Sequence, residues 1–257
     1  VGNQIQGGRT HDTANHLLQD AEFNYAYDAN GNLTRKTRIS DNPATVYTWD
    51  AENRLVEVQT PANRVRFKYD VFGRRIRKEI LAADGSLLTA HAFIYDGADL
   101  LLEANGANLL TIKHTFAAGI DRPLMREELD AAGQTVAAQV YHQDGNNNVT
   151  ALTDLSGNLV ESYEYTAFGK LSKFDASHNP MTGPPLTSFT FTAREFDPET
   201  GLYYFRARYY DPSIGRFVGD DPSGFAGGDV NFLAYVVNNP INLVDPLGLK
   251  DYTMQET

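Results

Sequence analysis

An aromatic residue followed by aspartate recurs along the first hundred residues at roughly the spacing of one β-hairpin. The four pairs are Tyr27-Asp28, Trp49-Asp50, Tyr69-Asp70 and Tyr95-Asp96. Their starts are 22, 20 and 26 residues apart, and each pair precedes a turn and then a basic or apolar continuation. A period of this length suits a strand–turn–strand unit that buries one face against its neighbours. The repeat therefore predicts an all-β fold of stacked hairpins.

Alternation supports strands within these units. In the segment RVRFKYD, Val65, Phe67 and Tyr69 fall on one face of an extended chain, while the basic residues fall on the other. Turn residues lie where hairpins require them, at Asn30-Gly31 and at Phe72-Gly73. The aspartate after each aromatic residue is placed to accept hydrogen bonds from the amides of the turn.

The repeated aromatic residues themselves have two interpretations. A tyrosine ring beside a carboxylate can form a carbohydrate-binding surface. Stacked repeats must also bury the face that they share, and a regularly repeated aromatic residue at a strand end serves that purpose. We favour packing between neighbouring hairpins over ligand binding.

A different motif marks the C-terminal part of the chain. Asp-Pro-x-Gly occurs at residues 221–224 and again at residues 245–248. Proline fixes its own φ and extends the preceding residue, and glycine permits positive φ, so each motif is a rigid turn that directs one carboxylate. Two carboxylates directed into one pocket share a proton, as in aspartic proteases, and can activate water and protonate a leaving amine. Asp-Pro also occurs at Asp197 and Asp211, so plain turns are the alternative interpretation.

A family resemblance favours the catalytic interpretation. The run RARYYDPSIGRF…DPSGFAGGDVNFLAYVVNNPINLVDPLGL, which starts at Arg206, resembles the C-terminal core of Rhs/YD-repeat proteins. That family includes the C components of insecticidal Tc toxins and teneurin-type YD shells. The resemblance implies a single-turnover aspartyl autoprotease in which Asp221 and Asp245 form the catalytic pair and Arg208 is the assisting cation. Phe225 departs from the family pattern, where an aliphatic residue is common.

The resemblance also implies a cleavage site, a cargo and partners. The bond cut is the one between Leu249 and Lys250, and the YD-repeat hairpins spiral into part of a hollow shell around a C-terminal toxin. The implied partners are this toxin, a secretion apparatus such as a type VI system or another delivery protein, and an immunity protein against the toxin. The protein would be bacterial, made in the cytoplasm and then secreted or delivered to a target cell. A non-catalytic surface-adhesion or carbohydrate-binding β-repeat protein is the alternative.

The domain organisation follows from these motifs. We expect a β-shell segment over residues 1–172, a proline-rich loop over 173–188, a core with the protease motifs over 189–249, and the start of the cargo region over 250–257. Within the core, alternation from Tyr203 to Tyr210 predicts one strand that carries Arg206 and Arg208 on the same face. Asp197, Glu195 and Glu199 are candidate partners for the second arginine. The segment NFLAYVVNNP suggests one short helical turn packed on the sheet, with Phe232, Tyr235 and Val236 facing it.

The net charge and the residue types argue against several kinds of protein and of functional site. The formal net charge of -11 argues against nucleic-acid binding by the shell, because a protein that neutralises phosphates needs a positive field. The chain contains no cysteine, so it has no disulfide and no thiol nucleophile. No apolar run reaches the length of a membrane span. His114 and His142 lack metal-ligand spacing, and we expect no metal and no cofactor.

Overall fold

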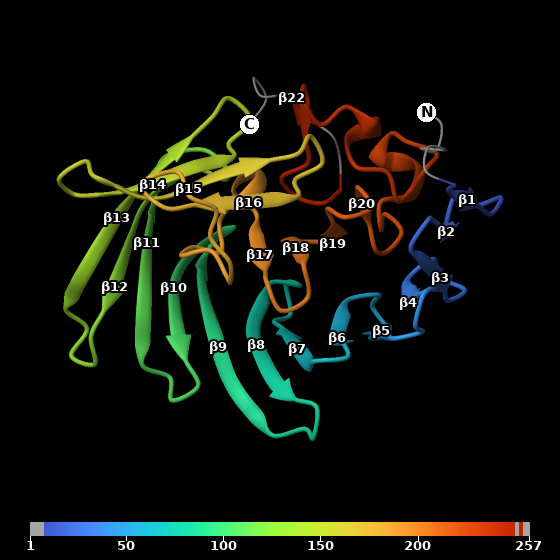
Figure 1. Ribbon diagram of the computed structural model, residues 1–257, viewed down its shortest axis with the longest axis horizontal. Coiled ribbons are helices and arrows are strands. Elements are labelled where there is room, and N and C mark those ends of the chain that lie inside the picture. Colours follow the sequence, from blue (N-terminus) through green and yellow to red (C-terminus); the bar gives the residue numbers. More distant parts are fainter. Residues whose placement is uncertain (1–7, 250–251, 254–257) are drawn as a thin grey trace.

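A single antiparallel sheet forms most of the protein. The computed structural model describes residues 8–249 and 252–253. Sixteen strands follow one another in sequence order, and each pairs with the next. They are β1 (Thr10–His11), β2 (Leu17–Gln19), β3 (Phe23–Tyr27), β4 (Leu33–Arg38), β5 (Ala44–Trp49), β6 (Leu55–Gln59), β7 (Asn63–Tyr69), β8 (Arg75–Ala82), β9 (Leu87–Asp96), β10 (Asp99–Asn105), β11 (Leu110–Phe116), β12 (Pro123–Leu129), β13 (Thr135–Gln143), β14 (Val149–Asp154), β15 (Leu159–Tyr165) and β16 (Leu171–Phe174). The sheet curves around the C-terminal part of the chain (Figure 1), which confirms the prediction of an all-β shell segment built from hairpins.

One five-residue turn closes many of the hairpins. In the turn after β3, Oδ1 of Asp28 accepts hydrogen bonds from the amides of Asn30 and Asn32, both at 2.9 Å. Gly31, the fourth residue, has φ +78°, a conformation that glycine or asparagine adopts at little cost. The same two hydrogen bonds, from backbone amides two and four residues later to the side-chain Oδ1, recur at Asp12, Asp50, Asp70, Asn105, Asp130, Asp144, Asp154 and Asp175. The predicted turn capping is confirmed at Asp28, Asp50 and Asp70, whereas Asp96 is a strand residue paired with Asp99.

The aromatic residues of the repeat join each hairpin to the one before it. Nε1 of Trp49 donates to the carbonyl of Leu33 at 2.8 Å, and the hydroxyl of Tyr69 donates to that of Leu55 at 2.5 Å. In both cases the acceptor is the first residue of the returning strand of the preceding hairpin. Tyr95 and Tyr165 bond in the same way to Arg75 and Val149. The aromatic rings pack against buried clusters and their polar tips are bonded to backbone, which supports the interpretation that they pack neighbouring hairpins together.

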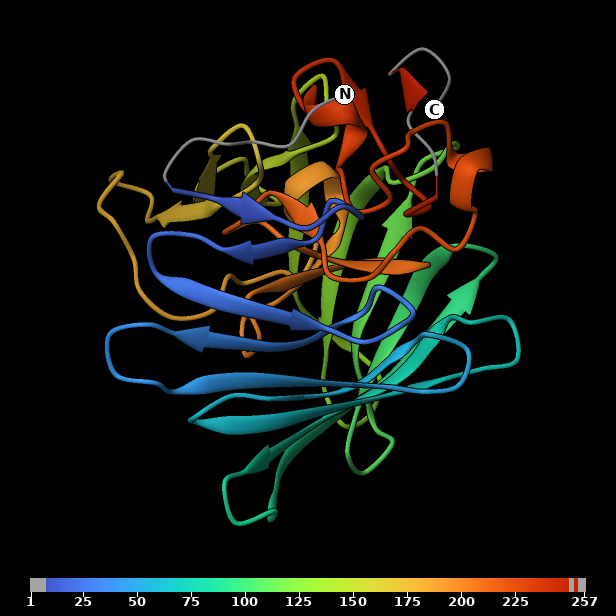
Figure 2. The same ribbon diagram turned by 90° about the vertical axis from the view of Figure 1, so that its right-hand side faces the viewer.

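A second, smaller sheet lies inside the curve of the first. It contains β17 (Glu195–Asp197), β18 (Leu202–Phe205), β19 (Arg208–Asp211) and β20 (Arg216–Phe217), all antiparallel. One core cluster joins Tyr204, Tyr209 and Val218 of this region to side chains of the outer strands. Figure 2 shows the first strands of the outer sheet passing in front of the inner segment. The outer sheet ends at Phe174, and the boundaries expected at residues 172 and 188 stay predictions.

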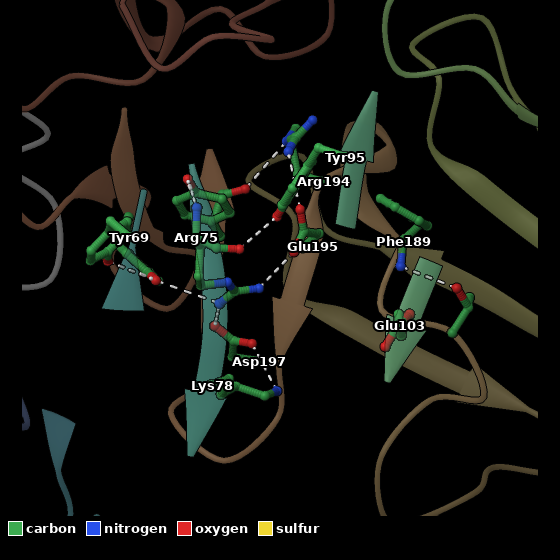
Figure 3. Close-up of polar contacts among 12 residues, drawn as sticks. Tyr69, Arg75, Lys78, Tyr95, Glu103, Phe189, Arg194, Glu195 and Asp197 are labelled. Atoms are coloured by element: carbon green, nitrogen blue, oxygen red, sulfur yellow. Dashed lines mark hydrogen bonds and ion pairs between the residues drawn. The ribbon is translucent and has the colours of Figure 1, made fainter. Parts of the chain in front are cut away.

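A buried ionic network fastens the inner sheet to the outer one (Figure 3). Arg75 of β8 is 1% exposed and pairs with Asp197 and with Glu195, the latter at 2.7 Å. Lys78 lies 3.0 Å from Asp197 and 3.1 Å from Glu199. Burial alone would raise the pKa of Asp197, but attraction to Arg75 and Lys78 outweighs it and holds the pKa below its usual value. The network therefore requires Asp197 to be ionised.

The inner sheet differs from the predicted single strand at Arg206. The chain reverses there, because Tyr203 pairs with Tyr210 and Phe205 pairs with Arg208 across a two-residue turn. The prediction that Arg206 and Arg208 share one strand face is wrong, since Arg206 adopts φ +56° in the turn. Arg206 pairs with Asp121, at 2.8 Å, and the carboxylates expected to bind it are held by Arg75 and Lys78.

Short helical turns complete the core. They are η1 (Phe191–Ala193), η2 (Gly224–Gly227) and η3 (Val236–Asn238), and two further short strands, β21 (Leu243–Val244) and β22 (Tyr252–Thr253), pair with each other. A helical turn is present near the expected place as η3, and Tyr235 and Val236 pack in the core cluster, but Phe232 lies outside both the turn and the cluster. Val236 and Val237 have φ of +43° and +46°. No helix within the described ranges is long and apolar enough to cross a membrane.

Candidate functional site

The two Asp-Pro-x-Gly loops meet at one arginine side chain. Nη2 of Arg208 lies 3.1 Å from Oδ2 of Asp221 and 3.1 Å from Oδ2 of Asp245. These three residues are 13 to 37 positions apart along the chain, and the fold brings together the charged groups that the family resemblance had grouped. Asp245 is 1% exposed and Arg208 is 7% exposed. In this low-dielectric setting one guanidinium faces two carboxylates.

Arg208 is held in place by contacts other than the two carboxylates. It belongs to β19, and its guanidinium lies over the ring of Phe217, 3.6 Å from the ring centroid. Nη1 donates to the carbonyl of Phe232 at 2.8 Å, and Nε donates to the carbonyl of Gly248 at 2.5 Å. A planar guanidinium has donors in fixed directions, so one side chain can fix both loops at once.

Each aspartate serves both its turn and the cluster. Oδ1 of Asp221 accepts a hydrogen bond from the amide of Ser223 at 2.7 Å, and Oδ1 of Asp245 accepts one from the amide of Leu249 at 3.0 Å. The Oδ2 atoms face Arg208. The turn and cluster interpretations of these motifs are therefore compatible, because different oxygens of the same carboxylate are involved.

The backbone of Leu249 contacts the loop of Asp245 and lies near that of Asp221. Its amide is bonded to Asp245. A Cβ atom placed on Gly227 would lie 2.8 Å from Oδ2 of Asp221 and 3.1 Å from the Leu249 carbonyl oxygen, so both oxygens lie next to this glycine. Lys250, the residue expected beyond the cut, lies outside the described residues. Sequence reasoning missed Gly227, although the Gly-Gly pair in the core motif was a visible signal.

A cavity of about 540 Å³ adjoins this cluster. Arg208, Asp221, Leu247 and Leu249 line one part of it. Successive turns of the outer hairpins and the rings of Trp49, Tyr69, Tyr95, Tyr204 and Tyr209 line much of the rest. The half-buried Leu249 side chain is therefore next to an apolar space bounded by both sheets.

The first Asp-Pro loop also contacts the outer hairpins. The carboxylate of Asp220 lies against Gly31, where a Cβ atom would come within 2.3 Å of it, and Nε2 of His16 is 3.5 Å from Oδ1 of Asp220. Burial raises the pKa of Asp220. Nothing in the sequence indicated that Asp220 and His16 would meet.

Among the described residues, no group of three or more acidic or histidine side chains could hold a metal ion.

Comparison with known proteins agrees with this architecture. Residues 10–231 match the family model described as the teneurin YD-shell. The chain belongs to this family. The YD-shell chain is 33% identical over 242 residues to the tRNA3(Ser)-specific nuclease WapA of Bacillus spizizenii, a match that covers 91% of this chain and 9% of the relative. It is 31% identical over 255 residues to the double-stranded DNA deaminase toxin A of Burkholderia cenocepacia, covering 91% of this chain and 17% of that protein.

A solved structure supports the fold of the YD-shell chain. The crystal structure of TcdB2-TccC3 superposes with a TM-score of 0.60 at 21% identity, covering 88% of this chain and 14% of that one. The chain thus spans less than a fifth of the length of these relatives. The resemblance to Rhs/YD-repeat proteins is confirmed by these matches. The catalytic roles of Asp221, Asp245 and Arg208 stay predictions.

Proposed function

We propose that this chain is a C-terminal section of a toxin-enclosing YD shell that cuts its own backbone after Leu249. The observation that carries the proposal is the position of Leu249, whose amide is bonded to Asp245 and whose carbonyl oxygen lies next to Gly227, which Oδ2 of Asp221 also borders. Arg208 pairs with both carboxylates. The catalytic pair, its assisting cation and the bond to be cut are thereby supplied by one short stretch of chain.

Hydrolysis at this site follows aspartyl protease chemistry. One aspartate, ionised, takes a proton from water as the water oxygen attacks the Leu249 carbonyl carbon, and the other, protonated, donates its proton to the carbonyl oxygen. The resulting diol collapses as a proton passes to the Lys250 nitrogen, which leaves a Leu249 carboxylate and a Lys250 amine. Arg208 stabilises the negative charge of the pair. Holding the bond within the same chain is an advantage that reaches about 7–11 kcal/mol in well-oriented intramolecular reactions.

The relatives support a toxin as the segment beyond the cut. The proteins with matching shells include a tRNA nuclease and a DNA deaminase toxin. We propose by analogy that the chain following Leu249 leads into a toxin enclosed by the complete shell. A secretion apparatus or delivery protein would carry the assembly to its target, and an immunity protein would protect the producer.

Mass measurement of a tagged protein tests the proposed cleavage. A folded tag is placed after Thr257, and wild type is compared with Asp221→Asn and Asp245→Asn, which keep side-chain size but remove a proton acceptor. We expect wild type to release the tag with a new terminus at Lys250, and both variants to stay intact. Efficient release from both variants would disprove the aspartyl pair. An intact wild-type chain would instead favour the adhesion protein as the function.

The order of the reaction tests whether cleavage is intramolecular. Asp245→Asn protein serves as a substrate for added wild type, and intact mass is followed over time. We expect no cleavage of the variant in trans and a wild-type half-life independent of concentration.

Substitutions at the cleavage site test which side chain is recognised. Leu249→Asp should block cleavage, because a charge would enter the apolar space that Leu249 adjoins, whereas Lys250→Ala should have little effect.

A further inference from the structure

The second Asp-Pro loop is held by the turn between β18 and β19. The amide of Ala207 donates to the carbonyl of Leu247 at 3.2 Å, and Arg206 donates from Nη1 to the carbonyl of Pro246. Gly248 is so close to this turn that a Cβ atom on it would come within 2.3 Å of the Phe205 carbonyl oxygen. The position of the turn therefore sets the position of the loop that carries Asp245.

Arg206 links the same turn to two hairpins of the outer sheet. Its Nη2 donates to Asp121 at 2.8 Å, in the connection between β11 and β12, and to the carbonyl of Ala98 at 3.3 Å, in the turn between β9 and β10. A second bond, from Nη1 to Asp121, measures 3.2 Å. Asp121 is 4% exposed and pairs also with Arg194. One guanidinium thus contacts the loop of Asp245 and two outer hairpins.

The backbone at Arg206 depends on these contacts. Its φ of +56° is uncommon for a residue other than glycine or asparagine, and it persists where surrounding contacts determine it. Burial alone would lower the pKa of Arg206, but attraction to Asp121 outweighs it and raises the pKa, so the side chain stays charged. Without Asp121 the side chain would be a largely buried cation that lacks its carboxylate, which is an unfavourable state.

We propose that Arg206 is a positioning residue that makes cleavage after Leu249 depend on the closure of hairpins β9–β10 and β11–β12 around the core. The inference rests on the proposed autoprotease. Until Asp121 and Ala98 are in place, Arg206 lacks the partners that hold it in the turn conformation, and the Pro246 carbonyl loses its fixed donor. The loop then presents Asp245 and the Leu249 amide out of register with Asp221. Cleavage would therefore take place only after these two hairpins of the outer sheet have closed around the core.

The test measures release of a folded tag placed after Thr257, followed in time after synthesis of the whole chain. Arg206→Gln removes the cation, and we expect cleavage to slow about 100-fold, the loss that a misplacement of about 1 Å can cause. Arg206→Lys keeps the charge but not the forked donors, so it should recover only part of that loss. Asp121→Asn should slow cleavage as well, and the double variant should be no slower than Arg206→Gln alone.

Two controls separate the possible failures. Arg74 is an arginine of an outer turn that lines the same cavity, but it pairs with Asp70 and donates to the carbonyl of Gly97, both in turns of the outer hairpins, so Arg74→Gln should cleave at the wild-type rate. Asp245→Asn should not cleave, and if it does, the proposed protease itself is wrong. If Asp245→Asn is inactive while Arg206→Gln cleaves as fast as wild type, the positioning role alone is overturned.

Thermal unfolding of every variant accompanies these rates. If Arg206→Gln does not fold, Arg206→Lys and Asp121→Asn decide the outcome, and wild-type rates for both folded variants would overturn the proposal. Multiplicative losses in the double variant, or an equal slowing by Arg74→Gln, would show a general loosening of the fold and would also overturn it.

Discussion

The outer hairpins and the inner core reach stability by different means. Nine turns of the outer sheet share one form, whose positive-φ position holds glycine, asparagine or, once, histidine, and hydrogen bonds from Trp49, Tyr69, Tyr95 and Tyr165 join neighbouring hairpins. In the core, positive φ falls on Thr192, Val236 and Val237, which are β-branched. Such residues cost about 1–3 kcal/mol each in this region of φ/ψ space, so contacts made elsewhere must offset them. The conformation of the outer turns follows from neighbouring residues in the sequence. The backbone conformation of the core depends instead on contacts between residues that are distant in the sequence.

The largest expected effect is at the junction of the two regions. Arg75→Met should lower the free energy of unfolding by about 3–5 kcal/mol, because it leaves the buried carboxylates of Glu195 and Asp197 without their main cation. Urea unfolding followed by circular dichroism measures it. Arg66→Met is the matched control within the outer sheet, since its pair with Glu57 is partly exposed and contributes about 0–1 kcal/mol. Equal losses in both variants would show that the junction is no stronger than a surface pair.

Exchanging the residue types at positive φ should have opposite effects in the two regions. Gly73→Val should destabilise the protein by about 1–2 kcal/mol, because valine is strained at φ +78°. Val237→Asn should stabilise it by up to about 1 kcal/mol, because asparagine tolerates φ +46°. The same unfolding measurement applies to both. A loss of stability in Val237→Asn would mean that the packing of Val237 outweighs its backbone strain.

Removing one aromatic hydroxyl should have a smaller effect. Tyr165→Phe deletes the donor to the Val149 carbonyl, 2.6 Å away, and keeps the ring, so we expect a loss of about 1 kcal/mol. Differential scanning calorimetry would detect the corresponding fall in melting temperature. If the melting temperature is unchanged, ring packing alone joins the hairpins.

The smallest effect concerns pH at the contact between Asp220 and the outer sheet. Burial raises the pKa of Asp220 in the folded state, so the folded protein binds this proton more tightly than the unfolded chain. The folded state is therefore disfavoured as pH rises past the unfolded pKa, and Asp220→Asn should stabilise the protein at pH 7 but not below about pH 4. Melting curves from pH 3.5 to 7 test this. A stability difference between wild type and Asp220→Asn that does not vary with pH would contradict it.

Sequence reasoning succeeded where the determining interactions are local. The aromatic–aspartate spacing was enough to predict hairpins, and the capping by Asp28, Asp50 and Asp70 spans four residues. Arg208, Asp221 and Asp245 were grouped by the family resemblance and not by local pattern; their charged groups meet, and their catalytic roles stay predictions. The alternation from residue 203 to 210 failed because both faces of this segment are buried, so polarity carried no sign of the reversal at Arg206.

The ion-pair partners of Arg75 and Arg206 could not have been predicted from the spacing of residues along the sequence. Arg75 and Asp197 are separated by 122 positions, and Arg206 and Asp121 by 85. Several acidic residues near each arginine in the sequence were equally plausible partners. The position of the inner sheet relative to the outer sheet determines which carboxylate each arginine binds. That position depends on the packing of many side chains at once.

The sequential order of the sixteen outer strands has a consequence for biosynthesis. Since each strand pairs with the next, the wall can form hairpin by hairpin as the polypeptide leaves the ribosome, with little cost in loop closure. Residues 208–249 are translated after all sixteen of these strands. Domain-like units that are made first generally fold first, so the core meets a nearly finished wall. The direction of translation therefore gives an order of events in which the bond after Leu249 is made later than the sixteen outer strands.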